Sequence, residues 1–261
     1  MGRIVCIANQ KGGVGKTTTS INLAAAVAAK GRKVLLVDLD PQGNATTGCG
    51  IDKYQLAHST LDALLGEVAV TKIVITIAED GMDLLPANAD LTAAEVELMA
   101  AQQKEQRLTQ ALAPVRDGYD YIFIDCPPSL NMLTVNALVA SDGLIVPIQC
   151  EYYALEGLSS LLDTIRQIQQ SRNPNLKIEG ILRTMHDPRN NLSNEVSAQL
   201  IEHFSELVFR SIIPRNVRVA ESPSHGMPVL RYDKNSRGAI AYLTLAGEFL
   251  GREAAGRKTS A

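Results

Sequence analysis

The sequence predicts a single α/β domain built on a mainly parallel, twisted sheet with helices on both faces. Short aliphatic runs alternate with longer segments of helical periodicity along the 261 residues, which is typical of βαβ units. Hydrophobic residues make up 46% of the chain but aromatic residues only 4%, with no tryptophan. The core is therefore expected to be aliphatic, as in buried parallel strands. A glycine-rich loop joins the first strand to the first helix.

Seven apolar runs are expected to form strands. They cover residues 3–8, 34–38, 82–86, 121–125, 143–147, 178–182 and 208–213. Six helices are predicted over residues 17–30, 61–65, 91–113, 155–170, 193–204 and 238–250. The chain has no internal repeat or long linker, so we expect residues 1–250 to form one domain. Residues 251–261 are small, polar and basic, and are predicted to be a disordered tail.

The charge is unevenly distributed along the chain. Its formal net value is −3, but residues 1–165 carry 11 basic and 19 acidic side chains, whereas residues 166–261 carry 14 basic and 9 acidic ones. A basic C-terminal part favours an anionic partner. An ordinary solvated surface is the alternative.

Cysteine spacing and hydropathy indicate in which cellular compartment the protein is expected. The four cysteines, Cys6, Cys49, Cys126 and Cys150, form no C-x-x-C pair. This pattern favours reduced, buried thiols in a cytosolic protein over a metal or iron–sulfur site. The N-terminal stretch does not resemble a signal peptide. No run approaches the roughly 20 apolar residues that span a bilayer.

The loop after the first strand has the composition of a phosphate-binding loop. It reads QKGGVGKTT over residues 10–18, whereas the usual pattern is G-x-x-x-x-G-K-[ST]. Gln10 replaces the first glycine of that pattern. The remaining glycines still allow the backbone N–H groups to surround phosphates, and the following helix adds a positive N-terminus.

Each residue of the loop then has an expected role. Lys16 can reach the β- and γ-phosphates, and the Thr17 hydroxyl can bind Mg²⁺. The residues expected to bind the nucleotide are Lys11, Gly12, Gly13, Val14, Gly15, Lys16, Thr17 and Thr18. A glycine-rich turn without a ligand is the structural alternative, but the strand before the loop and the helix after it argue against this.

Two carboxylates follow predicted strands. Asp40 lies just past the end of the strand at 34–38, where open α/β sheets bind ligands. It can position or polarise the attacking water, or bind Mg²⁺ through water; a turn aspartate before Pro41 is the alternative. Asp125 ends the apolar run 121–125 in the layout that brings a carboxylate to Mg²⁺. Asp38 is expected to be structural or to support the ligating residues from behind them.

Lys11 is not needed to hold phosphates within one chain, and here the sequence resembles the deviant Walker A ATPases with the loop K-G-G-x-G-K-[ST]. Across nearly its whole length it resembles the ParA/Soj family of partitioning ATPases within the MinD/ParA superfamily. The segments that carry the resemblance are NQKGGVGKTT (9–18), VDLDPQGNAT (37–46), IDCPPS (124–129), VPIQCEYYALEG (146–157) and IPRNVRVAESPSHG (213–226).

The resemblance implies roles for several residues. Lys11 matches the lysine that reaches the partner subunit's ATP across a dimer interface, and Asp40 matches the residue required for hydrolysis. The positions that match adenine contacts are Met185, Pro214 and Asn216. No GTPase-type N-K-x-D motif follows residues 178–182, which favours ATP over GTP.

A second set of residues is predicted to bind DNA. Arg189 and Arg218 match family arginines used for sequence-independent DNA binding, and Arg215 lies in the same basic part of the chain. Such binding needs only phosphate neutralisation and weakens steeply with salt. Each arginine alone is equally compatible with a solvated or ion-paired surface. No helix-turn-helix module is evident.

Taken together, these features predict an ATP-dependent switch with Mg²⁺ as cofactor. The resemblance implies a homodimer in the ATP-bound state, binding to duplex DNA, and slow hydrolysis stimulated by a ParB-type partner. It also implies a cytoplasmic, nucleoid-associated protein that partitions a chromosome or plasmid. The alternatives are a MinD-type membrane regulator, an iron–sulfur ATPase, and a related ATPase that positions another cargo. Residues 251–261 lack the amphipathic helix of the MinD type, so no membrane contact is expected.

Overall fold

Eight strands form one sheet in the order β3-β4-β2-β5-β1-β6-β7-β8. All neighbouring strands are parallel except β3 and β4. The computed structural model describes residues 1–259, with only the backbone described for Glu95 and residues 255–259. The strands are β1 (Arg3–Ile7), β2 (Val34–Asp38), β3 (Ile75–Ile77), β4 (Met82–Leu85), β5 (Tyr121–Asp125), β6 (Gly143–Gln149), β7 (Lys177–His186) and β8 (Val208–Pro214).

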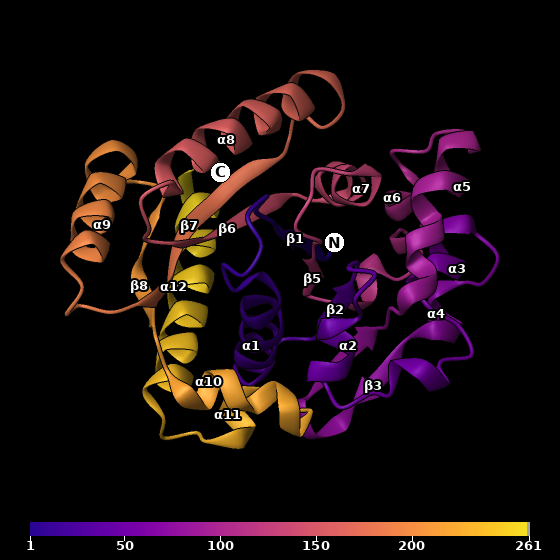
Figure 1. Cartoon of the computed structure of the whole chain (residues 1–261). Coiled ribbons are helices and arrows are strands. Elements are labelled where there is room, and N and C mark those ends of the chain that lie inside the picture. The colour runs from indigo at the N-terminus through magenta and orange to yellow at the C-terminus, as the bar shows by residue number, and fades with distance from the viewer. Residues whose placement is uncertain (260–261) are drawn as a thin grey trace.

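Helices cover both faces of this sheet (Figure 1). Helices α1 and α12 pack on one face, whereas α7 and α8 pack on the other. The α-helices are α1 (Lys16–Ala28), α2 (Asn44–Gly48), α3 (Thr60–Leu65), α4 (Val70–Ile73), α5 (Ala94–Ala100), α6 (Arg107–Leu112), α7 (Met132–Ala140), α8 (Ala154–Ser171), α9 (Asn191–Phe204), α10 (Val217–Glu221), α11 (Val229–Tyr232) and α12 (Arg237–Thr259). The predicted fold class is confirmed.

The central strands supply side chains to two separate cores. On β1, Ile4 and Cys6 join the core under α7 and α8, while Val5 and Ile7 join the core under α1 and α12. This alternation follows from the two-residue repeat of a strand. Because both faces are buried, β1 needs apolar residues at every core position, which explains the continuous aliphatic run in the sequence.

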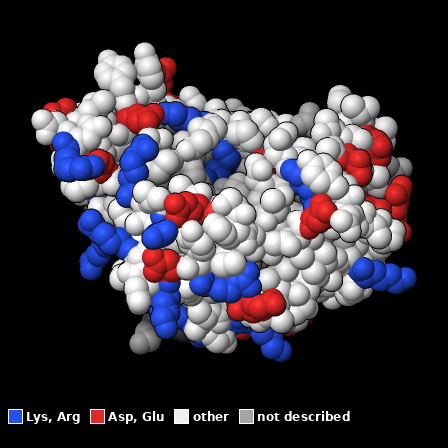
Figure 2. Space-filling model, turned by 60° about the horizontal axis from the view of Figure 1, so that its bottom comes forward, with Lys and Arg blue, Asp and Glu red and all other residues white. Residues whose placement is uncertain are grey.

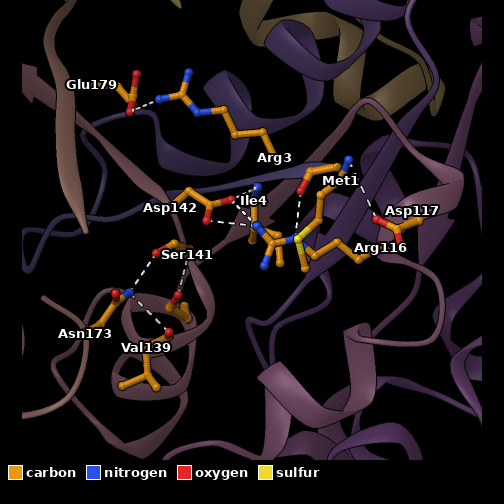
Figure 3. A network of polar contacts seen from close by, with 12 residues as sticks. Met1, Arg3, Ile4, Arg116, Asp117, Val139, Ser141, Asp142, Asn173 and Glu179 are labelled. Atoms are coloured by element: carbon orange, nitrogen blue, oxygen red, sulfur yellow. Dashed lines mark hydrogen bonds and ion pairs between the residues drawn. The ribbon is translucent and has the colours of Figure 1, made fainter. Parts of the chain in front are cut away.

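A polar network connects the amino ends of several strands, at the edge of the sheet opposite the phosphate loop (Figure 3). Asp142 accepts a hydrogen bond from the Ile4 backbone N–H at 2.8 Å. The same carboxylate accepts two bonds from the Arg116 guanidinium, at 2.8 and 2.6 Å. Arg3 pairs with Glu179 nearby. These pairs fix the starts of β1, β6 and β7 relative to one another.

Asn173 belongs to the same region and holds the end of α7. Its amide nitrogen lies 2.9, 3.1 and 2.7 Å from the carbonyl oxygens of Leu138, Val139 and Ser141. These are among the carbonyl groups that a helix leaves without internal partners.

Substitution of Asn173 by alanine is therefore expected to lower the free energy of unfolding by about 1–3 kcal/mol, the cost of leaving partly buried carbonyls unsatisfied. Urea denaturation would measure this loss. The matched control is Asn175→Ala, two residues away at an exposed position, where the change should stay within about 0.5 kcal/mol. Equal effects of the two substitutions would contradict the assigned role.

The long helix predicted over residues 91–113 was wrong. The structure has a short 3₁₀ turn (Ala89–Ala93), then α5 and α6, with a break at residues 101–106. Asn136 of α7 holds this break, because its side chain accepts from the Leu108 N–H at 3.1 Å and donates to the Lys104 carbonyl at 2.8 Å. A tertiary contact of this kind overrides helix propensity and leaves no local pattern.

The prediction of a disordered tail from residue 251 was also wrong. Helix α12 continues to Thr259, and Arg252 donates to the Val208 carbonyl and to Glu248, at 2.8 and 2.9 Å. The contact with Val208 attaches the helix to β8, and the contact with Glu248 lies within α12. Residues 260–261 lie outside the described part. None of the helices in the described part is both long and apolar enough to cross a bilayer.

Candidate nucleotide-binding site

The loop between β1 and α1 has the backbone of an anion cradle. Gly13 and Gly15 have φ angles of 75° and 85°, which residues with a Cβ rarely adopt. Helix α1 then begins at Lys16 without any side-chain cap at its N-terminus. The N–H groups of its first turn, together with the helix dipole, are suited to a negatively charged ligand.

Neighbouring strands hold this loop in place. The Asn9 side chain donates to the Pro147 carbonyl at 2.7 Å and accepts from the Lys11 N–H at 3.0 Å. On the other side, the Thr184 hydroxyl of β7 donates to the Val14 carbonyl at 2.8 Å. The loop is thus fixed from β6 and β7 before any ligand arrives.

A cavity of about 470 Å³ opens at this loop, and we call it the nucleotide pocket. It is bounded by the loop and α1, the segment after β2, and the segments after β7 and β8. Its lining comprises Gly12, Gly13, Gly15, Lys16, Thr17, Thr18, Asp40, Gln42, Asn44, Pro128, Thr184, Met185, Ile213, Pro214, Arg215, Asn216, Val219, Ala220 and Tyr242. The structure therefore brings the loop together with predicted residues from distant segments. Lys11, Val14 and Asp125 are outside the lining.

The two lysines of the loop have opposite environments. Lys16 is only 6% exposed, lines the pocket and donates to the Lys11 carbonyl at 3.0 Å. Burial lowers the pKa of Lys16, although Asp125 and Asp40 oppose this effect. The Lys11 side chain is 45% exposed, and its Nζ atom lies 2.5 Å from Glu151. Lys16 thus lines the pocket of its own chain, whereas Lys11 is not part of the lining.

Asp125 ends β5 beside β1 and β2, and it is fully buried. One carboxylate oxygen accepts from the Ser20 hydroxyl at 2.8 Å. The other oxygen is buried without a hydrogen-bond partner among the described residues. Burial raises the pKa of Asp125, and the neighbouring Asp38 carboxylate adds to this rise. A buried carboxylate oxygen of this kind fits a nearby cation.

The donor set also suits Mg²⁺ in particular. Mg²⁺ prefers oxygen ligands and usually binds through one or two carboxylates, substrate phosphates and waters. Thr17 and Asp40 line the pocket and supply a hydroxyl and a carboxylate. Within the described residues, no group of three or more His, Cys, Asp or Glu side chains could hold a metal ion by itself. Substrate phosphates and waters would complete the ligand shell of a Mg²⁺ ion held here.

Asp40 is fixed within a short hydrogen-bonded segment. It is 7% exposed, and its Oδ1 atom accepts from the Gln42 N–H at 2.9 Å. Its own N–H donates to Asp38 at 3.2 Å, and Asp38 accepts from the Thr46 N–H and hydroxyl at 2.8 and 2.7 Å. The structural role expected for Asp38 is thus visible: it anchors the segment that carries Asp40.

The pocket lining includes the three positions predicted to contact the adenine base. Met185 adopts a φ of 49°, a left-handed conformation that is uncommon for a residue with a side chain. Pro214 and Asn216 also line the pocket. Asn216 uses its carbonyl oxygen to cap α10 through the Val219 N–H at 3.2 Å. Its amide NH₂ group is then the part that can donate to a ligand.

The three predicted DNA-binding arginines do not share one environment. Arg189 is exposed and forms two hydrogen bonds with Asp187, at 2.9 and 2.8 Å. Arg218 lies 3.0 Å from Glu221 and 3.4 Å from Asp233. Arg215 is exposed and borders the nucleotide pocket. Two of the three are therefore ion-paired within the chain.

Sequence reasoning missed several pocket residues. Thr184 and Tyr242 come from β7 and α12, and no local pattern marks them. Tyr242 is buried, with its hydroxyl 3.5 Å from that of Thr19. Gln42 and Asn44 stand in the VDLDPQGNAT segment, so their closeness to Asp40 in the sequence was an available signal.

Comparisons with known proteins agree with this geometry. Residues 2–178 match a family model described as an AAA domain. The Bacillus subtilis sporulation initiation inhibitor protein Soj is 52% identical over 248 residues, or 95% of this chain and 98% of Soj. The Caulobacter vibrioides chromosome partitioning protein ParA is 50% identical over 253 residues, or 96% of this chain and 95% of that protein.

A solved structure extends the comparison to three dimensions. It is described as cobyrinic acid a,c-diamide synthase from Mycobacterium smegmatis with a bound ATP analog and magnesium. It aligns with a TM-score of 0.87 and 41% identity, over 99% of this chain and 98% of that one. The fold, the phosphate loop and the identity to Soj and ParA over almost the whole length point the same way. This chain belongs to the ParA/Soj family of partitioning ATPases.

Proposed function

We propose that this protein is an ATP-driven dimerising switch that binds DNA without sequence preference and partitions a chromosome or plasmid with a ParB-type partner. ATP binding forms the dimer, and hydrolysis to ADP and phosphate ends it. The observation that carries this proposal is the contrast between the buried Lys16 inside the nucleotide pocket and the exposed Lys11 outside it.

Within one subunit, different pocket residues bind different parts of the nucleotide. The glycine loop and Lys16 bind the phosphates, and Met185, Pro214 and Asn216 contact the base. Mg²⁺, when bound, neutralises part of the phosphate charge, and Thr17, Asp40 and Asp125 are the residues that would hold it. Asp40 positions the attacking water. No stronger base is needed, since phosphoryl transfer relies mainly on positioning and electrostatics.

Lys11 links the nucleotide to dimerisation in this proposal. Its partner, Glu151, is 47% exposed, and exposed ion pairs of this kind contribute only about 0–1 kcal/mol. Lys11 can therefore leave Glu151 at little cost and reach a phosphate of the second subunit. ATP then bridges two copies of the chain.

The DNA-binding part rests on the distribution of charge. Lysine and arginine side chains are numerous on the left of the space-filling view (Figure 2), where α9, β8 and α12 lie in Figure 1, with several Asp and Glu side chains among them. Acidic side chains are prominent at the right edge of the same view. A face rich in lysine and arginine suits a phosphate backbone, and two such faces in a dimer increase the apparent affinity. Cytoplasmic, nucleoid-associated localisation follows from this.

The rival functions receive less support. All four cysteines are buried, so they are poorly placed to bridge a cluster between two subunits. The diamide synthase name of the M. smegmatis structure describes another activity, whereas Soj and ParA, which are more identical to this chain than that protein is, are named for sporulation control and partitioning. A relative that positions a different cargo would use the same ATPase machinery.

Steady-state ATP hydrolysis tests the proposal directly. We expect a slow rate with ATP and Mg²⁺ alone and a clear rise when duplex DNA and the ParB-type protein of the same cell are both added. Lys16→Ala serves as the control, because loss of the buried pocket lysine should remove hydrolysis under every condition. A rate that neither DNA nor the partner changes would count against the partitioning role.

A further inference from the structure

Helices α10 and α11 and the turn between them form one side of the nucleotide pocket. Val219 and Ala220 of α10 belong to the pocket lining. The two helices are joined by a side-chain contact, because the Tyr232 hydroxyl of α11 donates to the Glu221 carboxylate of α10 at 3.2 Å. Residues 217–232 are therefore held together, and we call them the α10–α11 unit.

An asparagine of α1 reaches this unit from the phosphate side of the pocket. Asn22 is 2% exposed, and its side-chain oxygen accepts from the Val229 N–H at 2.7 Å. Val229 is the first residue of α11, so its N–H has no partner within that helix. The Asn22 amide nitrogen donates to the Thr18 carbonyl at 2.8 Å. Asn22 thus connects the α10–α11 unit to the first turn of α1, which holds the phosphates.

Burial makes this connection costly to break. Asn22 and Val229 are 207 residues apart in the sequence, and both are excluded from solvent. Without the Asn22 oxygen, the Val229 N–H would be buried and unsatisfied, which costs more than an ordinary hydrogen bond contributes. The α10–α11 unit would relieve this cost by shifting until water reaches the N–H group. Such a shift changes the position of one pocket wall relative to the phosphate loop.

The two ends of a nucleotide meet different sides of this connection. The phosphates face the loop and the start of α1, whereas Asn216 is one of the predicted base contacts. Asn216 caps α10 through the Val219 N–H at 3.2 Å, so its position follows that of the α10–α11 unit. A shift of the unit should therefore weaken binding of the adenosine part and leave phosphate binding intact.

We propose that Asn22 is a positioning residue for the nucleotide, which holds the α10–α11 unit at the distance from the phosphate loop that adenosine requires. Asn22 is not part of the described pocket lining, so it acts through Val229 and not by touching the ligand. The proposal rests on the proposed function, because it takes Asn216 as a contact of the base.

Comparison of ADP with inorganic pyrophosphate tests this role, since pyrophosphate offers the phosphates without the adenosine. Neither ligand requires ATP hydrolysis or the ATP-bound dimer, and both affinities are measured by calorimetry with Mg²⁺. Asn22→Ala should weaken ADP binding by about tenfold, the order expected for one unsatisfied buried N–H, and change pyrophosphate binding by less than about twofold. In steady-state hydrolysis, KM for ATP should rise while kcat stays close to the wild-type value, the pattern of lost uniform binding.

Two further variants separate positioning from general loss of stability. Asn22→Asp keeps an oxygen that accepts from the Val229 N–H, and it should restore most of the ADP affinity. Asn173→Ala removes a hydrogen-bonding asparagine at the opposite edge of the sheet. It should lower stability but leave both affinities unchanged.

Hydrogen exchange of the wild-type protein adds a measurement that needs no variant. ADP should slow amide exchange in residues 217–232, because it holds the α10–α11 unit against the pocket. Pyrophosphate should slow exchange there much less, since it binds only at the phosphate loop. If Asn22→Ala does not fold, this comparison decides the matter, and equal protection by the two ligands would overturn the inference.

The outcomes separate the inference from the proposed function. If the wild-type protein prefers ADP but Asn22→Ala weakens both ligands equally, or neither, the inference is overturned while the proposed function stands. An Asn22→Asp variant as weak as Asn22→Ala would overturn it as well. If the wild-type protein binds ADP no better than pyrophosphate, the base contacts of the proposed function fail, and Asn22 has no adenosine to position.

Discussion

Replacement of Asp40 by alanine is expected to lower the rate of ATP hydrolysis by about 10²–10⁴-fold, the usual contribution of a side chain that assists proton transfer. Asp40 borders the nucleotide pocket. Its carboxylate accepts from the Gln42 N–H and its own N–H donates to Asp38, and these two bonds fix its position. The loop and Lys16 remain intact in the variant. ATP should therefore still bind, and the ATP-bound dimer should accumulate because it is no longer consumed.

Single-turnover hydrolysis and light scattering measure the two halves of this prediction. Asp40→Asn tests the cause, because the amide keeps an acceptor for the Gln42 N–H but carries no charge. It should lose hydrolysis to nearly the same extent as the alanine variant. Asp163→Ala on α8 is the control for removal of an exposed carboxylate. Turnover of Asp40→Ala close to the wild-type rate would remove Asp40 from the reaction.

The sheet was predictable because its strands are buried on both faces. Segments such as Val34–Asp38 and Tyr121–Asp125 are buried at every position, so each appears in the sequence as four mostly apolar residues followed by an aspartate. Helix α7 was missed for the same physical reason. Six of its nine residues, MLTVNALVA, are buried, and such a helix has no polar face to reveal its period. The three-residue edge strand β3 is too short to produce a pattern.

The candidate site was predictable where its residues are neighbours in the sequence. The loop that holds Lys16 and Thr17 has a fixed spacing, since phosphate binding requires that geometry within one turn. Thr184 has no such spacing, because it reaches the Val14 carbonyl from 170 residues away. The sequence also did not show which charged side chains are ion-paired. Arg189 and Arg215 look alike in the sequence, and only the fold shows that Arg189 is occupied by Asp187.

Substitution of Lys11 by alanine is expected to abolish ATP-dependent dimerisation while each subunit still binds nucleotide. Lys11 is outside the nucleotide pocket, whereas Lys16 and the glycine loop remain unchanged. A cation supplied in trans to a transferring phosphate contributes about 10³–10⁵-fold to rate in comparable phosphoryl transfers. The partner-stimulated hydrolysis rate should therefore fall by about 10³-fold or more. Nucleotide affinity, sedimentation with ATP and stimulated turnover measure the three effects.

Glu151→Gln is the matched control, because it removes the ion pair of Lys11 but keeps the lysine. The pair joins two side chains that are 45% and 47% exposed, so its loss should cost at most about 1 kcal/mol and leave dimerisation intact. If Lys11→Ala dimerises normally with ATP, the lysine does not act across the interface. If it instead loses nucleotide binding as a monomer, Lys11 serves the nucleotide of its own chain, and ATP is not a bridge between subunits.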